Sequence, residues 1–169
     1  SYRSSCAHGI CGSDALVING RVELACQKLV RDYRTANNFV IEPLPLFRVI
    51  KDLVIDMDPF FQKHREVRPY LISDVDPPEK ERLQEAENQE FLEPALRCIL
   101  CASCTASCPI NRANDKYLGP AALLRAFRYI ADDLPEETRH AIEKGLRRQA
   151  EMLRYHDCDC TNQWLIMLH

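Results

Sequence analysis

Four cysteines and a proline fall within twelve residues near the middle of the chain, as Cys98, Cys101, Cys104, Cys108 and Pro109. The spacing is C-x2-C-x2-C-x3-C-P, the run that folds over cubane iron–sulfur clusters. Two intervening residues let the chain curl and offer successive thiolates to neighbouring irons, and the proline starts a helix. In two-cluster ferredoxins the fourth cysteine binds the other cluster. The spacing therefore predicts two clusters in one domain.

Two other uses of these thiols compete with this interpretation. A structural zinc site usually pairs two C-x2-C knuckles across a longer spacer, and three thiols at this spacing crowd one tetrahedral ion. Disulfides need an oxidising compartment, and the chain has nine cysteines, which leaves one unpaired. The first residues show no secretory signal. We therefore expect a reducing compartment, in which the cysteines bind metal.

A second group of possible ligands opens the chain and consists of Cys6, Cys11, Asp14 and Cys26. This is the plant-type C-x4-C-x2-C…C pattern with an aspartate in the third place. A [2Fe–2S] cluster needs four anionic ligands, and Asp14 can supply an oxygen. The alternative is that Asp14 caps the turn by accepting a hydrogen bond from a backbone amide. The sequence leaves both roles for Asp14 open.

The elements that must position the first group are predicted to be strands. Residues 15–25 indicate a hairpin closed by Asn19-Gly20, which would bring Cys26 back against the loop. Residues 27–47 are expected to stay strand-like, with Pro43 and Pro45 at a sheet edge. One hairpin and one further strand bury too little surface to fold alone. We therefore predict a β-domain over residues 1–47 whose upstream strands are missing from this chain.

The second group lies in a part of the sequence with helical periodicity, and we predict a helical domain over residues 48–169. A helical face begins at Lys51 and is interrupted at Asp58-Pro59, where a break or a fresh helix start is expected. Residues 111–116 are polar and indicate a loop. The last helix is expected to deliver Cys158 and Cys160. Further helix starts are predicted at Pro77-Pro78, Glu93-Pro94, Gly119-Pro120 and Pro135.

The bulk properties of the chain exclude several classes of partner and reaction. The net charge of −3 offers no basic surface for nucleic acid or anionic lipid. No apolar run approaches the length of a bilayer span, so membrane association is expected only through a partner. No Ser/His/Asp arrangement or phosphate-binding loop indicates an independent active site.

Taken together, these residues resemble the iron–sulfur subunit of succinate dehydrogenase and fumarate reductase, from Ser5 to about Cys160. The resemblance implies an α+β chain, in which the C-terminal part of a ubiquitin-like (β-grasp) [2Fe–2S] ferredoxin domain precedes an all-α domain for a [4Fe–4S] and a [3Fe–4S] cluster. Landmarks besides the cysteines are Asn19-Gly20, Glu42-Pro-Leu-Pro45, Lys51-Asp-Leu-Val54, Arg68-Pro-Tyr-Leu71 and Tyr117-Leu-Gly-Pro-Ala121.

The resemblance also implies a place in the tricarboxylic acid cycle and the respiratory chain. Electrons would pass from the flavin of a partner flavoprotein subunit, along the three clusters, to a quinone held between this subunit and a membrane anchor subunit. The complex would lie on the cytoplasmic face of the inner membrane or on the mitochondrial matrix face. The implied ligands are Cys6, Cys11, Asp14 and Cys26 for [2Fe–2S], Cys98, Cys101 and Cys104 for [4Fe–4S], Cys108, Cys158 and Cys160 for [3Fe–4S], and Pro109 and His156 for the quinone pocket.

The C-terminus departs from the family pattern. The family's last motif reads roughly R-C-H-x4-C-x3-C-P, and here Tyr155 and Trp164 stand where thiolates are expected. The helical part has six cysteines, although two such clusters need seven, so the cubane lacks a fourth protein ligand. Three alternatives remain: an iron–sulfur subunit of a thiol:fumarate or heterodisulfide reductase, an inactive truncated copy, and a zinc-stabilised interaction module.

Overall fold

The predicted hairpin is the centre of the N-terminal part of the chain. In the computed structural model, which describes residues 1–33, 38–73, 76–132 and 134–153, β1 (Ala15–Ile18) pairs with β2 (Arg21–Leu24) in antiparallel register. Asn19 and Gly20 form the turn with φ of 48° and 81°, as a two-residue type I′ turn requires. β3 (Ile41–Glu42) pairs with the other side of β1, which gives the order β2-β1-β3.

The strand-like stretch predicted over residues 27–47 is mostly wrong. The chain instead forms two 3-10 turns, η1 (Ala25–Gln27) and η2 (Val30–Tyr33), before the two residues of β3. At η2 the carboxylate of Asp32 accepts a hydrogen bond from the N–H of Leu29 at 3.2 Å. Such a local side-chain bond offers the backbone an alternative to a strand ladder.

The helical face predicted from Lys51 is also wrong as far as residue 57. A second small sheet forms there from β4 (Val49–Lys51) and β5 (Val54–Ile55), because the β-branched residues on either side of the Asp52 turn favour strands. The fresh helix start predicted at Asp58-Pro59 is confirmed, since α1 runs from Asp58 to Glu66.

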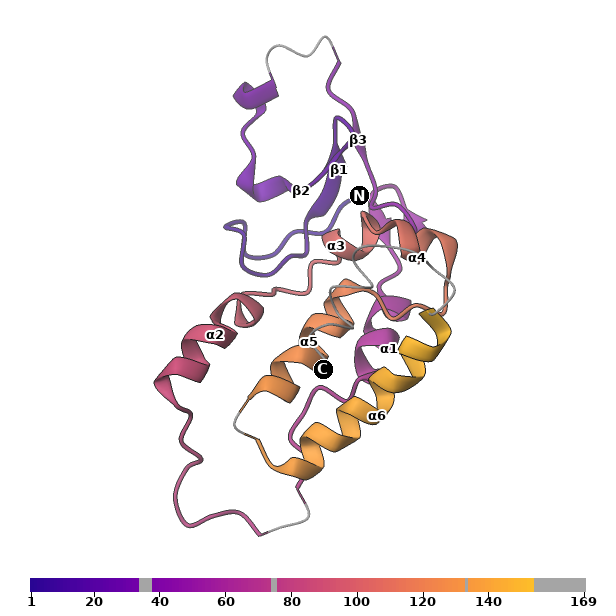
Figure 1. Ribbon diagram of the computed structural model, residues 1–169. Helices are drawn as coiled ribbons and strands as arrows, with labels where there is room; N and C mark the ends of the chain where they lie inside the picture. The colour runs from indigo at the N-terminus through magenta and orange to yellow at the C-terminus, as the bar shows by residue number, and fades with distance from the viewer. Residues whose placement is uncertain (34–37, 74–75, 133, 154–169) are drawn as a thin grey trace.

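Five further helices make up the rest of the described chain (Figure 1): α2 (Ala86–Leu96), α3 (Ser103–Ala106), α4 (Pro109–Ala113), α5 (Pro120–Ala131) and α6 (Glu136–Leu153). The starts predicted at Gly119-Pro120 and after Pro135 are confirmed. The start at Pro77-Pro78 is wrong, and Pro94 lies inside α2, where burial of Leu92 and Ala95 keeps the helix intact. Part of the polar stretch predicted as a loop belongs to α4.

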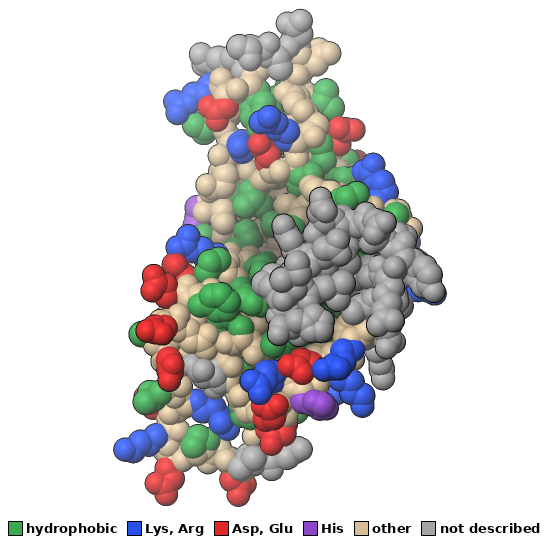
Figure 2. Space-filling model, in the orientation of Figure 1, with side chains coloured by type: hydrophobic (Ala, Val, Ile, Leu, Met, Phe, Trp, Pro, Cys, Tyr) green, Lys and Arg blue, Asp and Glu red, His purple; other side chains and the backbone are tan. Residues whose placement is uncertain are grey.

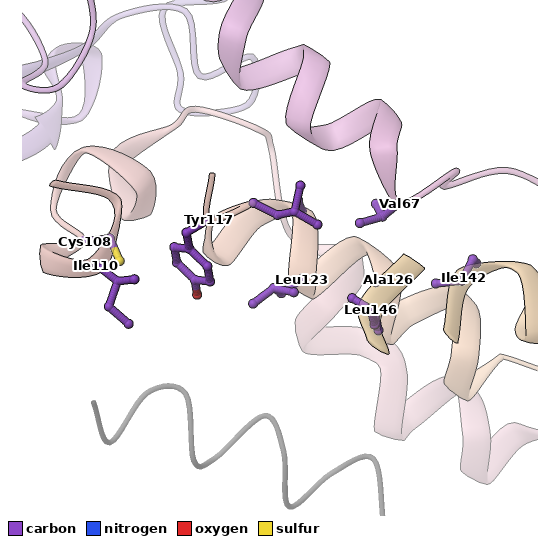
Figure 3. Close-up of a cluster of buried hydrophobic side chains, with 10 residues drawn as sticks. Val67, Cys108, Ile110, Tyr117, Leu123, Ala126, Ile142 and Leu146 are labelled. Carbon is purple, nitrogen blue, oxygen red and sulfur yellow. The ribbon is translucent and has the colours of Figure 1, made fainter. Parts of the chain in front are cut away.

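Two hydrophobic cores hold these elements together. The helical core lies between α5, α6 and the end of α1, and Figure 3 shows Cys108 and Tyr117 at one end of it and Ile142 at the other. The junction core joins the small sheets to the helices through Ala15, Leu44, Ile55, Phe60, Ala102, Ala106 and Ala121. The cysteine run at residues 98–108 therefore lies between both cores. In the described part of the chain, no helix has both the length and the apolar character of a bilayer span.

Candidate iron–sulfur centre

The first loop directs backbone amides at a cysteine sulfur. The N–H groups of His8, Ile10 and Cys11 donate to Sγ of Cys6 at 3.5, 3.4 and 3.3 Å. These bonds lower the pKa of Cys6 to about 6, and the bond from His8 has the largest effect. Hydrogen bonds to the charged form favour that form, and the thiolate is the form that binds metal. The loop is therefore arranged for an anionic sulfur at Cys6.

The hairpin brings Cys26 back against this loop, as predicted. The N–H of Gly9 donates to Sγ of Cys26 at 3.2 Å. Oδ2 of Asp14 accepts a hydrogen bond from the N–H of Cys26 at 2.7 Å. This carboxylate has the largest of the effects that raise the pKa of the Cys26 thiol. Oδ1 of Asp14 is buried and has no hydrogen-bond partner in the described chain. Asp14 thus accepts a backbone hydrogen bond, which is the capping role, and its other oxygen has no partner in the described chain.

The third thiol of this group, Cys11, is exposed. Its Sγ lies 3.2 Å from Oγ of Ser13, and this contact has the largest of the effects that lower the pKa of Cys11. Among the residues that the structure describes, no three Cys, His, Asp or Glu side chains converge closely enough for a single metal ion. A cluster shares its ligands among several irons. The three thiols of Cys6, Cys11 and Cys26 and the unpartnered Oδ1 of Asp14, which the hairpin brings to one loop, are four anionic donors of the kind that a [2Fe–2S] cluster needs.

The second loop curls in the way that the C-x2-C-x2-C spacing predicts. Leu100 and Ala102 have left-handed backbones, with φ of 55° and 64°. Burial raises the pKa of Cys104, and the charges of Cys101 and Cys98 raise it further. The second effect indicates that the three thiols lie near one another, because the interaction of charges weakens with distance. Three thiols on one curl fit a cubane cluster.

The fourth cysteine of the run is separated from the other three. Cys108 precedes α4 and is only 8% exposed, packed in the helical core with Ile110 (Figure 3). Pro109 is the first residue of α4 and is exposed. The remaining predicted residues of the three-iron cluster and the quinone pocket, Cys158, Cys160 and His156, lie outside the described residues, so those two sites stay predictions.

The two loops are in direct contact, a feature that sequence reasoning missed. An ideal Cβ built on Gly12 would lie 2.7 Å from Cβ and 2.9 Å from Cα of Cys101. Only glycine allows the backbones to approach this closely. Beside the contact lies a pocket of about 500 Å³, lined from both loops by residues that include Cys11, Ser13 and Leu100. A glycine between the proposed ligands Cys11 and Asp14 was the sequence signal for this contact.

A basic residue behind the second loop was also missed. Nη2 of Arg125, on α5, donates to the carbonyl oxygen of Cys98 at 3.2 Å. The signal in the sequence was a charged residue beside the buried Ala122, Leu123 and Ala126 of the same helix. Helical periodicity identified the apolar face but assigned no role to the arginine.

Comparison with known proteins finds iron–sulfur proteins of similar sequence. Residues 1–62 match a family model described as a 2Fe-2S iron-sulfur cluster binding domain. The chain is 43% identical over 142 residues to the succinate dehydrogenase iron-sulfur subunit of Coxiella burnetii, covering 83% of this chain and 60% of that protein. The subunit of the same name from Paracoccus denitrificans is 41% identical over 164 residues, covering 96% and 62%.

The fold has a counterpart among solved structures. A chain of the Mycobacterium smegmatis Sdh1 complex in the apo form superposes with a TM-score of 0.73 at 21% sequence identity, covering 93% of this chain and 80% of that one. This likeness concerns the fold. The chain spans about 60% of the length of the two bacterial relatives that it matches.

Proposed function

Because this chain is a homologue of the iron–sulfur subunits of succinate dehydrogenase, we propose that it is the electron-transfer subunit of such a complex. It would relay electrons between the flavin of a partner flavoprotein subunit and a quinone, through [2Fe–2S], [4Fe–4S] and [3Fe–4S] clusters. The observation that carries this proposal is the direct contact of Gly12 with Cys101, because an electron relay needs its centres in close succession.

The proposed ligands follow the two loops. Cys6, Cys11, Asp14 and Cys26 would hold [2Fe–2S], Cys98, Cys101 and Cys104 would hold [4Fe–4S], and Cys108, Cys158 and Cys160 would hold [3Fe–4S]. When bound, the clusters supply one-electron redox chemistry, with potentials set by cluster type, charge, hydrogen bonds to sulfur and exposure. The described residues show the last two of these factors directly.

The described residues supply them differently in the two loops. Three backbone N–H groups hold the sulfur of Cys6 in an exposed loop, and Gly9 holds that of Cys26. Hydrogen bonds to an anionic sulfur stabilise the added electron of a reduced centre. Cys108, in contrast, is enclosed by the helical core, which excludes water from its sulfur. The protein would thus give the proposed two-iron and three-iron centres different polarity and solvent access.

The finer fold is part of the proposal. The N-terminal part would be the C-terminal portion of a β-grasp domain, and the helices after it would form an all-α dicluster domain. Ile41 of β3 is exposed at the free edge of the sheet, Phe39 and Val40 just before it are exposed as well, and further hydrophobic side chains reach the surface of this part (Figure 2). An unpaired apolar edge is a place where further strands add. The domain boundary predicted at residue 47 remains a prediction.

The partners and the location belong to the proposal as well. The subunit would bind a flavoprotein and a membrane anchor, with the quinone near Pro109 and His156. It would sit peripherally on the cytoplasmic face of the inner membrane or on the mitochondrial matrix face. Pro109 supports this arrangement because it is exposed directly beside the buried Cys108, so a quinone at the surface would be adjacent to the last proposed ligand loop.

Electron paramagnetic resonance with iron and sulfide analysis tests the proposal on the anaerobically purified protein. We expect a three-iron signal in the oxidised state, and two-iron and four-iron signals after reduction with dithionite. Cys26→Ala should remove only the two-iron signal and Cys104→Ala only the four-iron signal, so each variant is the control for the other. Zinc in place of iron would refute the proposal, and a two-iron signal alone would indicate a broken relay.

A further inference from the structure

Arg125 is held directly behind the start of the second cysteine loop. Its helix, α5, packs against α2, and α2 ends at Leu96, two residues before Cys98. The hydrogen bond from Nη2 of Arg125 to the carbonyl oxygen of Cys98, at 3.2 Å, links the middle of α5 to the first residue of the cysteine run. The guanidinium group is therefore fixed in position relative to this loop.

The charge of Arg125 has no carboxylate partner among the ion pairs of the described chain. Its Nε is buried and makes no hydrogen bond there. His64, on α1, does not balance the charge of Arg125. Burial is the main cause that lowers the pKa of this histidine, and the charge of Arg125 lowers it further. Arg125 is half-buried, and a cation that loses water contacts without gaining an anion is costly for the folded state. The lack of a carboxylate partner among the described residues points to an anion that these residues do not provide.

We propose that the guanidinium of Arg125 is the counter-charge of the cluster held by Cys98, Cys101 and Cys104, and that it raises the reduction potential of that cluster. The inference rests on the proposed function, since it requires a [4Fe–4S] cluster in the second loop. Thiolate ligands give such a cluster a net negative charge, and reduction adds one electron to it. A fixed cation stabilises the reduced form more than the oxidised form. Arg125 is thus a positioning residue, which touches the ligand loop and acts on the cluster through its charge.

A redox titration followed by electron paramagnetic resonance tests this inference in the full-length protein within its complex. For Arg125→Gln we expect the ratio of reduced to oxidised cubane at a fixed potential to fall about tenfold, which corresponds to a midpoint lower by about 59 mV for one electron. The midpoint of the two-iron centre should stay unchanged. Arg125→Lys keeps the charge and should keep most of the potential.

The matched control is Arg128→Gln, on the same helix. Arg128 also has a buried Nε without a partner in the described chain, but its guanidinium lies 4.5 Å from the ring centroid of Tyr129, and the described contacts include no bond to Cys98. We expect this variant to leave the cubane midpoint unchanged. An equal shift in both variants would overturn the specific role of Arg125.

The remaining outcomes separate this inference from the proposed function. Absence of a cubane signal from the wild-type protein would overturn the proposed function and this inference together. A wild-type signal with the same midpoint in Arg125→Gln would overturn the inference alone. If Arg125→Gln assembles no cubane, then Arg125→Lys decides: retention of the cluster supports the role of the charge, and its loss shows that only the hydrogen-bond geometry matters.

Discussion

Replacing Gly12 by alanine should force the two cysteine loops apart. Gly12 has φ of 68°, and a left-handed backbone costs an L-residue about 1–2 kcal/mol. The new Cβ would also lie 2.7 Å from Cβ of Cys101, so the loops would have to separate by about 0.7 Å, the difference between 2.7 Å and the 3.4 Å of an ordinary contact. Overpacking of this kind costs about 1–3 kcal/mol more.

The matched control for this variant is Gly20→Ala, in the turn between β1 and β2. Gly20 has φ of 81°, but nothing lies within 4 Å of its ideal Cβ. Gly20→Ala therefore has the conformational cost without the collision. Because 1 kcal/mol shifts the midpoint of a chain of this size by about 2–4 °C, thermal unfolding should place Gly12→Ala roughly 2–12 °C below Gly20→Ala.

Spectroscopy of the reduced protein gives a second measurement of the same contact. The magnetic interaction between the reduced two-iron and four-iron centres should weaken in Gly12→Ala, because the loops that hold them are further apart. It should be unchanged in Gly20→Ala. Equal unfolding temperatures for the two variants, together with unchanged magnetic interaction, would refute the contact between Gly12 and Cys101 as the feature that sets the spacing of the loops.

Three further predictions follow from single contacts. Asp14→Ala removes the acceptor of the Cys26 N–H and should lower the free energy of unfolding by about 1–3 kcal/mol, measured with denaturant, whereas Asp14→Asn keeps an acceptor and should lose less. In cluster-free protein, alkylation of Cys6 by iodoacetamide should reach half its maximal rate near pH 6, because its pKa is about 6 and the thiolate predominates above that pH. Leu92→Ala should cost about 2–5 kcal/mol since Leu92 is 0% exposed, against less than about 0.5 kcal/mol for Leu83→Ala, which is 84% exposed.

Each of these predictions has a result that contradicts it. Equal unfolding of the Asp14→Ala variant and the wild type would show that the Cys26 amide has another acceptor. An alkylation midpoint near the ordinary cysteine pKa of 9.0 would show that the amides of the first loop do not converge on Cys6. Similar losses for the two leucine variants would contradict the packing of α2 against α5.

The elements that sequence reasoning predicted best are those with local signals. The hairpin was correct because Asn19-Gly20 favours a type I′ turn whatever surrounds it. The starts of α1, α5 and α6 were correct because proline at the beginning of a helix loses no hydrogen bond. The helix start predicted at Pro77-Pro78 was wrong, because a proline permits a helix to begin but does not require it. The helix α2 forms only where Leu92 and Ala95 can be buried.

Cysteine spacing by itself predicted the cluster chemistry that we propose for this protein. The intervals at residues 98–108 and 6–26 predict cluster ligands because the reach of the chain between two thiols is fixed by the number of residues between them. Tertiary structure alone decided how the two loops meet. Gly12 against Cys101 and Arg125 on Cys98 are contacts between residues 89 and 27 positions apart, and no local preference encodes them. They arise because the junction core and the helical core bury their apolar faces together, which brings the two loops into contact and α5 behind the second loop.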